Sequence, residues 1–372
     1  MKMKIRIRIV SAVLAATLTS SALVGCSSET PTSNTPVVET NTPAETNTPA
    51  ETNTPAETTA GNEANLGSQR TGIGVVTDVS KSKSATADAA GNAQVDSIVA
   101  VVTVDADGRI THCTLDAAQT KVPVDAAGNV TKDGVLLLSK NELGNDYGMK
   151  RVSSIEKEWF EQAAAISEYV IGKTLAEVSA IPLTDSGVPD VAELATAVTV
   201  SSGGYIEAIK KAINNSVGGA EADGPVKTGS GVTTTVESST SASRVQVDTY
   251  IAAVTIDADG RITNCSIDVA QTRVPVDASG NLTTDVNLLT KHELKGDYGM
   301  IVASSIEKEW YQQSGAFAQY VIGKTLDEVK AIPLDTHDDS HFFPDVAELA
   351  TTVTIGVTDY IEVIEKAIKN AR

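Results

Sequence analysis

The feature that most constrains the fold of this chain is that one long segment occurs twice. The octapeptide Val104–Thr111, with the sequence VDADGRIT, returns almost unchanged as Ile256–Thr263. Further matches follow in the same order, among them Ser153–Trp159 with Ser304–Trp310, Tyr169–Leu175 with Tyr320–Leu326, and Pro189–Thr196 with Pro344–Thr351. Because the copies stay almost collinear over this length, they indicate the tandem duplication of a whole domain rather than a short-period solenoid.

Within each repeat, the apolar pattern predicts strands first and helices afterwards. Strands are expected in the first repeat at 72–79, 95–104 and 109–115. Helices are expected at 153–170 and 205–213. Asp107-Gly108 is typical of a hairpin turn, Ser153 is a suitable N-cap and Gly172 a suitable stop. We therefore expect an α+β fold of two tandem homologous domains, each an antiparallel sheet with helices packed on one side.

The domain boundaries follow from the matched segments. We expect the first domain at 70–216 and the second at 229–372. Residues 217–228 are rich in glycine and acidic residues, which is typical of a linker. Each repeat is long enough and apolar enough to be expected to fold alone.

The N-terminus has the layout of an export signal. Four basic residues precede the apolar run Ile9–Leu23, which is too short and too interrupted for a membrane span. The run ends in Leu23-Val-Gly-Cys26, which resembles the lipobox of bacterial lipoproteins. That resemblance implies that residues 1–25 are removed and that Cys26 carries the lipid anchor, on the extracellular face of the cytoplasmic membrane. An ordinary signal peptide that happens to contain a cysteine is the alternative.

Residues 26–69 are expected to form a stalk that carries the anchor at its start. Asn-Thr-Pro-Ala-Glu-Thr occurs three times from Asn41, and recurring proline without apolar periodicity predicts an extended, solvated and disordered segment. Its threonines could carry O-glycans. After cleavage, 25 basic residues would face 48 acidic ones, a net charge of −23. An acidic chain repels phosphate backbones, so no nucleic-acid partner is expected.

Cysteine and histidine are too few for a disulfide framework or a large metal centre. The chain has three cysteines and four histidines. Cys113 and Cys265 occupy equivalent positions and are expected to be small buried residues, with a redox role as the alternative. His337 and His341 flank two aspartates in the second repeat only, where a solvated insertion is favoured over a metal site. No metal site is predicted.

A threonine-rich segment precedes the last helix of each repeat. It reads Thr196-Ala-Val-Thr199-Val-Ser-Ser202 in the first and Thr351-Thr-Val-Thr354-Ile-Gly-Val in the second. This pattern resembles the motif of the FMN-binding domain family, Ser/Thr-Gly-Ala-Ser/Thr, two residues, then Ser/Thr, in which the phosphate of FMN is esterified to a threonine hydroxyl. The resemblance implies that Thr199 and Thr354 bear the flavin, that Thr196 and Thr351 open the motif, and that Ser202 closes it.

The segment departs from the family motif at several positions. The Gly-Ala pair is Ala197-Val198 in the first repeat and Thr352-Val353 in the second, and the closing hydroxyl is replaced by Val357. Asp359 adds a negative charge where the second repeat would hold the phosphate. We therefore expect Thr354 to be the weaker site. Ordinary threonines at the end of a strand are the alternative.

Aromatic residues outside the motif are further candidates. Trp159 and Trp310 lie on an amphipathic helix, where core packing is favoured over stacking on a flavin. The turns Tyr147–Met149 and Tyr298–Met300 are comparable candidates for lining the flavin.

The layout of anchor, stalk and two repeats resembles the two-domain flavinylated surface lipoproteins of Gram-positive extracellular electron transfer. The resemblance implies an electron carrier, rather than an enzyme that turns over a substrate, with one covalent FMN per repeat. Its partners would be a flavin transferase, a membrane quinol oxidoreductase and extracellular electron acceptors. Two other functions stay open: a non-redox surface-exposed binding or immunogenic lipoprotein, and a surface reductase with its own substrate.

Overall fold

The computed structural model describes residues 66–222, 224–336 and 342–372. The predicted signal peptide, Cys26 and nearly all of the predicted stalk lie outside these ranges, as do His337 and His341. No helix within the described ranges is both long enough and apolar enough to cross a membrane.

Three long strands and four helices form the first repeat. The strands β1 (Leu66–Asp78), β2 (Gly91–Val104) and β3 (Ile110–Val124) are antiparallel. A short strand, β4 (Val217–Ala220), pairs with β1, so the sheet order is β3-β2-β1-β4. The helices are α1 (Lys140–Leu143), α2 (Trp159–Tyr169), α3 (Leu175–Ser179) and α4 (Gly203–Asn214).

The second repeat has the same order of elements. Its sheet is β5 (Lys227–Thr235), β6 (Arg244–Ile256) and β7 (Ile262–Pro275), in that order. Its helices are α5 (Lys291–Leu294), α6 (Trp310–Tyr320), α7 (Leu326–Lys330) and α8 (Thr358–Lys369). A small hairpin, β8 (Leu334–Thr336) and β9 (Phe342–Pro344), precedes α8. The predicted α+β fold with two antiparallel sheets is confirmed.

Several elements differ from their predicted bounds. The strands β1 and β2 begin at Leu66 and Gly91 instead of at residues 72 and 95. The helix expected from Ser153 begins at Trp159, because Glu158 is its N-cap and forms a capping box with Glu161. Glu156 has a φ of 53°, in the left-handed region, so no α-helix can run through it. Strand β3 continues to Val124 instead of ending near residue 115.

The expected linker also contains regular structure. Residues 217–220 form β4, and β5 begins at Lys227. A Cβ atom on Gly219 would collide with the backbone carbonyl of Thr263 in the second repeat. The glycine there allows close packing between the repeats, rather than the flexibility that its composition predicts.

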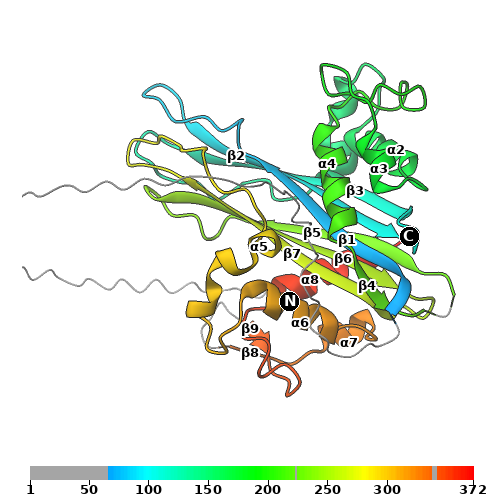
Figure 1. Cartoon of the computed structure of the whole chain (residues 1–372). Helices are drawn as coiled ribbons and strands as arrows, with labels where there is room; N and C mark the ends of the chain where they lie inside the picture. Colours follow the sequence, from blue (N-terminus) through cyan, green and yellow to red (C-terminus); the bar gives the residue numbers. More distant parts are fainter. Residues whose placement is uncertain (1–65, 223, 337–341) are drawn as a thin grey trace, which may run out of the picture. The chain divides into compact units, whose positions relative to one another are not determined.

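Each sheet buries both of its faces. On β2, Ala100, Val102 and Val104 pack against the helices of their own repeat. Val99 and Val101, which alternate with them, pack against β5, β6 and β7 of the other repeat. This double burial explains why the strand reads as an uninterrupted apolar run. The layers are therefore helices, sheet, sheet and helices (Figure 1).

Paired glycines bring the last helix of each repeat close to its sheet. A Cβ atom on Gly72 or Gly74 of β1 would collide with the backbone of α4 or of the residues that follow it, and Gly229 and Gly231 of β5 lie in the same way beneath α8 and its end. These positions require glycine because the helix lies directly on the strand.

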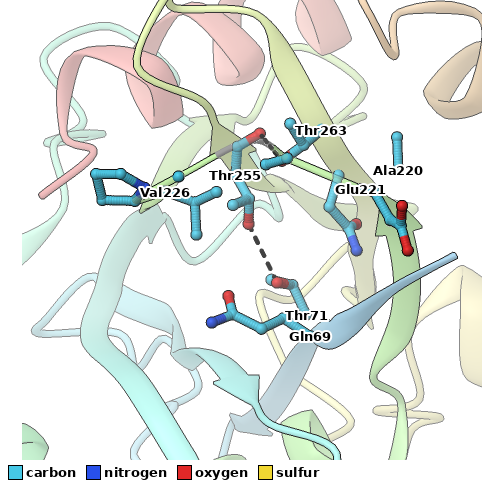
Figure 2. Close-up of a pocket in the computed structure, with 12 residues that line it drawn as sticks. Gln69, Thr71, Ala220, Glu221, Val226, Thr255 and Thr263 are labelled. Carbon is cyan, nitrogen blue, oxygen red and sulfur yellow. Dashed lines mark hydrogen bonds between the residues drawn. The ribbon is translucent and has the colours of Figure 1, made fainter.

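A ring of four threonine hydroxyls joins the two sheets. Thr71 contacts Thr103 at 3.0 Å within the first repeat, and Thr228 contacts Thr255 at 3.0 Å within the second. Across the repeats, Thr103 lies 3.1 Å from Thr228. Thr71 lies 3.1 Å from Thr255, as Figure 2 shows. All four side chains are buried. The sequence pattern predicts two independent domains, but these inner faces are buried only when both repeats are present.

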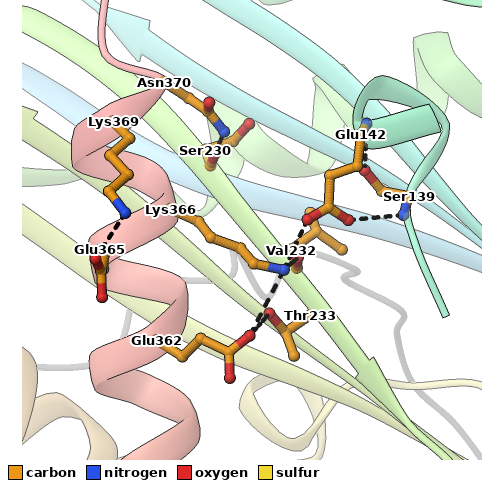
Figure 3. A network of polar contacts seen from close by, with 10 residues as sticks. All are labelled: Ser139, Glu142, Ser230, Val232, Thr233, Glu362, Glu365, Lys366, Lys369 and Asn370. Atoms are coloured by element: carbon orange, nitrogen blue, oxygen red, sulfur yellow. Dashed lines mark hydrogen bonds and ion pairs between the residues drawn. The ribbon is translucent and has the colours of Figure 1, made fainter. Parts of the chain in front are cut away.

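Contacts at the margins of this interface occur in equivalent pairs. Lys211 of α4 forms an ion pair with Glu293 of α5 at 2.7 Å, and Lys366 of α8 forms one with Glu142 of α1 at 2.8 Å (Figure 3). Backbone hydrogen bonds repeat in the same way, from Ala85 to Gly280 at 2.9 Å and from Ala242 to Gly128 at 2.8 Å. Such reciprocity is typical of twofold symmetry.

Candidate functional site

The threonine-rich motif forms the loop that leads into the last helix of each repeat. Val198 is buried in the core of the first repeat, and Thr199 beside it is half-buried. Val353 and Thr354 have the same places in the second repeat. The buried valine thus fixes the loop and leaves part of the threonine accessible.

A buried glutamine on α2 holds the first of these loops in place. Gln162 is fully buried, and its Oε1 accepts from the backbone N–H of Thr199 at 2.8 Å and of Val200 at 3.2 Å. The Thr199 hydroxyl donates to the same oxygen at 3.2 Å. On its other side, the amide nitrogen of Gln162 donates to the Ser153 hydroxyl and the Lys157 carbonyl, both at 3.4 Å.

Gln313 on α6 does the same in the second repeat. Its Oε1 accepts from the Thr354 N–H at 2.9 Å and from the Thr354 hydroxyl at 3.2 Å. Sequence reasoning missed both glutamines. The available signal was that each lies three residues after the matched tryptophan, on the buried face of its helix.

The helices that follow the motif begin without a side-chain cap. Ser202 is the N-cap residue of α4 and Val357 that of α8, and neither side chain accepts from the helix. The first N–H groups of a helix carry partial positive charge, so an uncapped start is suited to an anion.

The remaining motif residues lie in different surroundings. Thr196 and Thr351 are exposed at the turn that precedes the loop. Ser202 is fully buried, and its hydroxyl donates to the Val200 carbonyl at 2.9 Å. The structure therefore brings Thr199 and Thr354 to a buried glutamine and a helix start, and leaves the other threonines outside that arrangement.

The start of α8 differs from that of α4 in charge. Asp359 occupies the position of Gly204, and Tyr250 on β6 occupies that of Ile98 on β2. A Cβ atom on Gly204 would lie only 2.6 Å from the Ile98 side chain. In the second repeat, the Tyr250 and Asp359 side chains lie close enough that each affects the pKa of the other. Burial raises the pKa of both groups.

The two tryptophans are core residues. Trp159 and Trp310 are no more than 2% exposed. The indole N–H of Trp159 donates to the Tyr205 hydroxyl at 2.8 Å, and that of Trp310 donates to the Tyr360 hydroxyl at 2.7 Å. Rings buried in this way cannot stack on a flavin at the surface.

The tyrosines of the two Tyr-Gly-Met turns are more accessible than the tryptophans. Tyr147 and Tyr298 pack against the edges of the two cores and are partly buried. The Lys140 ammonium lies 4.7 Å from the Tyr147 ring centre, and the Lys291 ammonium lies 4.9 Å from that of Tyr298. These cation–π contacts give the turns a structural role.

Both cysteines of the repeats are unreactive. Cys113 and Cys265 are free and buried, as predicted, and burial raises the pKa of each thiol to about 12. Neither is a thiolate at neutral pH. Within the described ranges, no group of three or more His, Cys, Asp or Glu side chains is placed to hold a metal ion.

Cavities occur where the two repeats meet. The cavity in Figure 2, about 540 Å³, is lined by residues of both repeats, including Thr71, Thr255 and Asn264. Two others, of about 240 and 430 Å³, lie in equivalent places beside the buried carboxyls of Asp268 and Asp116. Neither motif threonine lines any of these three cavities.

No known protein family, curated protein or solved structure matches the chain. The observations that bear on its function are therefore its own residues and the resemblance of its threonine motif to that of the FMN-binding domain family.

Proposed function

We propose that the protein is a membrane-anchored extracellular flavoprotein that carries covalent FMN on Thr199 and Thr354 and passes electrons to extracellular acceptors. One observation supports this most strongly. In both repeats, a half-buried threonine lies in a fixed loop just before an uncapped helix start. A phosphoester needs such a hydroxyl, and its remaining negative charge is stabilised by free helix N–H groups.

The loop can carry a phosphoester without losing its support. Esterification replaces the hydrogen of the Thr199 hydroxyl and so removes one of the three hydrogen bonds to Gln162 Oε1. The backbone N–H groups of Thr199 and Val200 keep the other two. The residues present therefore fit the phosphate end of FMN.

The surroundings of the motif favour a carrier over an enzyme. Thr199 and Thr354 are half-buried rather than enclosed, so we expect a flavin attached to either of them to be reached from solvent. FMN supplies the redox chemistry when it is bound, and the chain supplies attachment and access. Enzymes that turn over a substrate more often exclude water from the reacting groups.

The rest of the chain sets the proposed route of the electrons. Cys26 holds the lipid anchor on the outer face of the cytoplasmic membrane, and the stalk extends from it. A flavin transferase loads the threonines, a membrane quinol oxidoreductase donates electrons, and extracellular acceptors remove them. These partners follow from the resemblance of the layout.

The intact mass of the exported protein tests the proposal. Produced with an active flavin transferase, the wild type should gain the mass of two FMN groups, each less the water that ester formation removes, and the Thr199→Ala and Thr354→Ala variants should gain one each. The double variant should be colourless. Thr352→Ala is a matched control, because Thr352 lies in the same loop but its hydroxyl donates to the Leu349 carbonyl at 3.3 Å. It should keep both flavins.

The second candidate is a non-redox surface-exposed binding or immunogenic lipoprotein. One observation favours it: both motif hydroxyls already donate to a buried glutamine, which gives them a structural role without a flavin. A wild type that stays unmodified in the presence of the transferase would support this function, and a flavin-loaded double variant would place the flavin on other residues.

A further inference from the structure

Asp248 on β6 has a buried carboxylate oxygen without a partner. The side chain is 4% exposed, and its Oδ2 accepts from the Gln246 amide at 2.7 Å. Its Oδ1 has no hydrogen-bond partner among the described residues. Burial of an ionised oxygen without a partner is costly, so this oxygen calls for a positive charge or a donor.

The equivalent residue of the first repeat has that positive charge. Asp96 on β2 accepts from the Gln94 amide at 2.9 Å, as Asp248 does from Gln246. In addition, the Lys81 ammonium donates to Asp96 Oδ2 at 2.8 Å. Asp248 therefore lacks the ammonium group that Asp96 has.

The second repeat has serine in place of this lysine. Two equivalent serines show how the residues of the two repeats correspond here. The Ser82 hydroxyl donates to the Gln94 carbonyl at 3.1 Å, and the Ser239 hydroxyl donates to the Gln246 carbonyl at 3.0 Å. The residue before Ser239 is Ser238, which is exposed and too short to reach across as Lys81 does.

Charged groups of both signs lie near Asp248. The Arg244 and Arg273 guanidiniums each donate to Gln246 Oε1 at 3.1 Å, but neither is hydrogen-bonded to Asp248 Oδ1. Asp359 and Tyr250 lie close enough for Asp248 to raise the pKa of both, although burial is the larger cause. Glu362 also raises the pKa of Asp359, whereas Lys291 lowers it. The equivalents of Asp359 and Tyr250 in the first repeat are a glycine and an isoleucine, which carry no charge.

We propose that the second repeat binds a monovalent cation at Asp248, in the place that the Lys81 ammonium takes in the first repeat. The bound ion would supply the single positive charge that the Lys81 ammonium supplies in the first repeat, so we expect a small monovalent cation such as sodium, potassium or ammonium. Asp248 supplies the oxygen that binds it, and the nearby carboxylate of Asp359 adds to the attraction. This site does not depend on the flavin.

Thermal unfolding of the exported protein in different chloride salts tests this site. At one ionic strength and pH 7, sodium, potassium or ammonium should raise the Tm above its value in N-methylglucamine, a cation too large to enter. The rise should saturate with concentration and be on the order of 2 °C. Comparison of the three small cations identifies the ligand.

Matched variants exchange the residue types at the two equivalent positions, Ser238 and Lys81. Ser238→Lys supplies a tethered ammonium and should abolish the cation-specific rise. Lys81→Ser opens the equivalent place in the first repeat and should enlarge the rise. Asp248→Asn should abolish the rise, whereas Asp96→Asn should leave it unchanged.

Three results would overturn the proposal. The first is a wild-type Tm that is the same in all four salts. The second is a full cation-specific rise in both Asp248→Asn and Ser238→Lys. The third is an Asp248→Asn variant that is more stable than the wild type by the same amount in every salt, because that would mean the buried carboxyl lowers stability whether or not a small cation is present.

Discussion

The hydroxyl of Thr71 lies 3.1 Å from the hydroxyl of Thr255, although the two residues belong to different repeats. This contact closes the threonine ring between the sheets. Thr71→Val keeps the shape of the side chain but leaves the hydroxyls of Thr103 and Thr255 with one ring partner fewer. We expect the free energy of unfolding to fall by about 1–3 kcal/mol in urea titrations.

A conservative variant separates the hydrogen bonds from packing. Thr71→Ser keeps the hydroxyl and removes only a methyl group, so it should lose less stability than Thr71→Val. Equal losses in the two variants would mean that the ring contributes through packing alone.

Separation of the repeats should expose the shared inner faces. A chain of residues 70–216 leaves Val99 and Val101 on an uncovered apolar face. We expect it to self-associate, or to bind a chain of residues 227–372 when the two are mixed, as measured by light scattering. Two monomeric repeats that each unfold cooperatively would contradict this, and would agree with the independent domains predicted from the sequence.

Asp116 should make stability depend on pH. Burial raises the pKa of this carboxyl to about 6, although three hydrogen-bond donors oppose the shift. A pKa raised in the folded state means that the contribution of Asp116 is fully present below about pH 4 and is lost as the pH rises through 6. Asp116→Asn should therefore gain Tm relative to the wild type between pH 4 and 6.

Asp125 offers a control of opposite sign. The Asn129 side-chain amide and two backbone N–H groups hold the pKa of this exposed carboxyl below its usual value. Asp125→Asn should therefore lose Tm relative to the wild type as the pH rises from acid. A parallel pH profile in the wild type and Asp116→Asn would show that Asp116 is not the titrating group.

Asp359 should slow flavin attachment in the second repeat. Its carboxyl lies at the second residue of α8, where Gly204 lies in α4. A negative charge at this point opposes a phosphate on Thr354. In a time course of intact mass, Thr199→Ala should gain its flavin more slowly than Thr354→Ala.

Removal of the Asp359 charge tests whether this charge is what slows flavin attachment to Thr354. Asp359→Asn in the Thr199→Ala background should raise the rate of attachment to Thr354. An unchanged rate would show that some other departure from the motif limits this site.

The strands were predictable because residues 72–79 alternate and residues 95–104 are rich in β-branched side chains, whereas the partner of the inner face was not predictable. Val99 and Val101 read as part of an apolar run and carry no sign of whether a helix or another sheet covers them. Thr71 reads as an ordinary strand residue, and only tertiary structure places it beside Thr255. The candidate threonines were found by their motif, but Gln162 was missed because its contact is made with a loop 37 residues away.

The reciprocal ion pairs of Lys211 and Lys366 bear on the ancestry of the chain. A surface that gives and receives the same contacts is self-complementary, which is the condition for a twofold homodimer. A single-repeat ancestor could have paired with itself before duplication joined the two copies. Once they were joined, the partners no longer had to be identical. Replacement of Lys81 by Ser238 in one copy could then change the chemistry of that half alone.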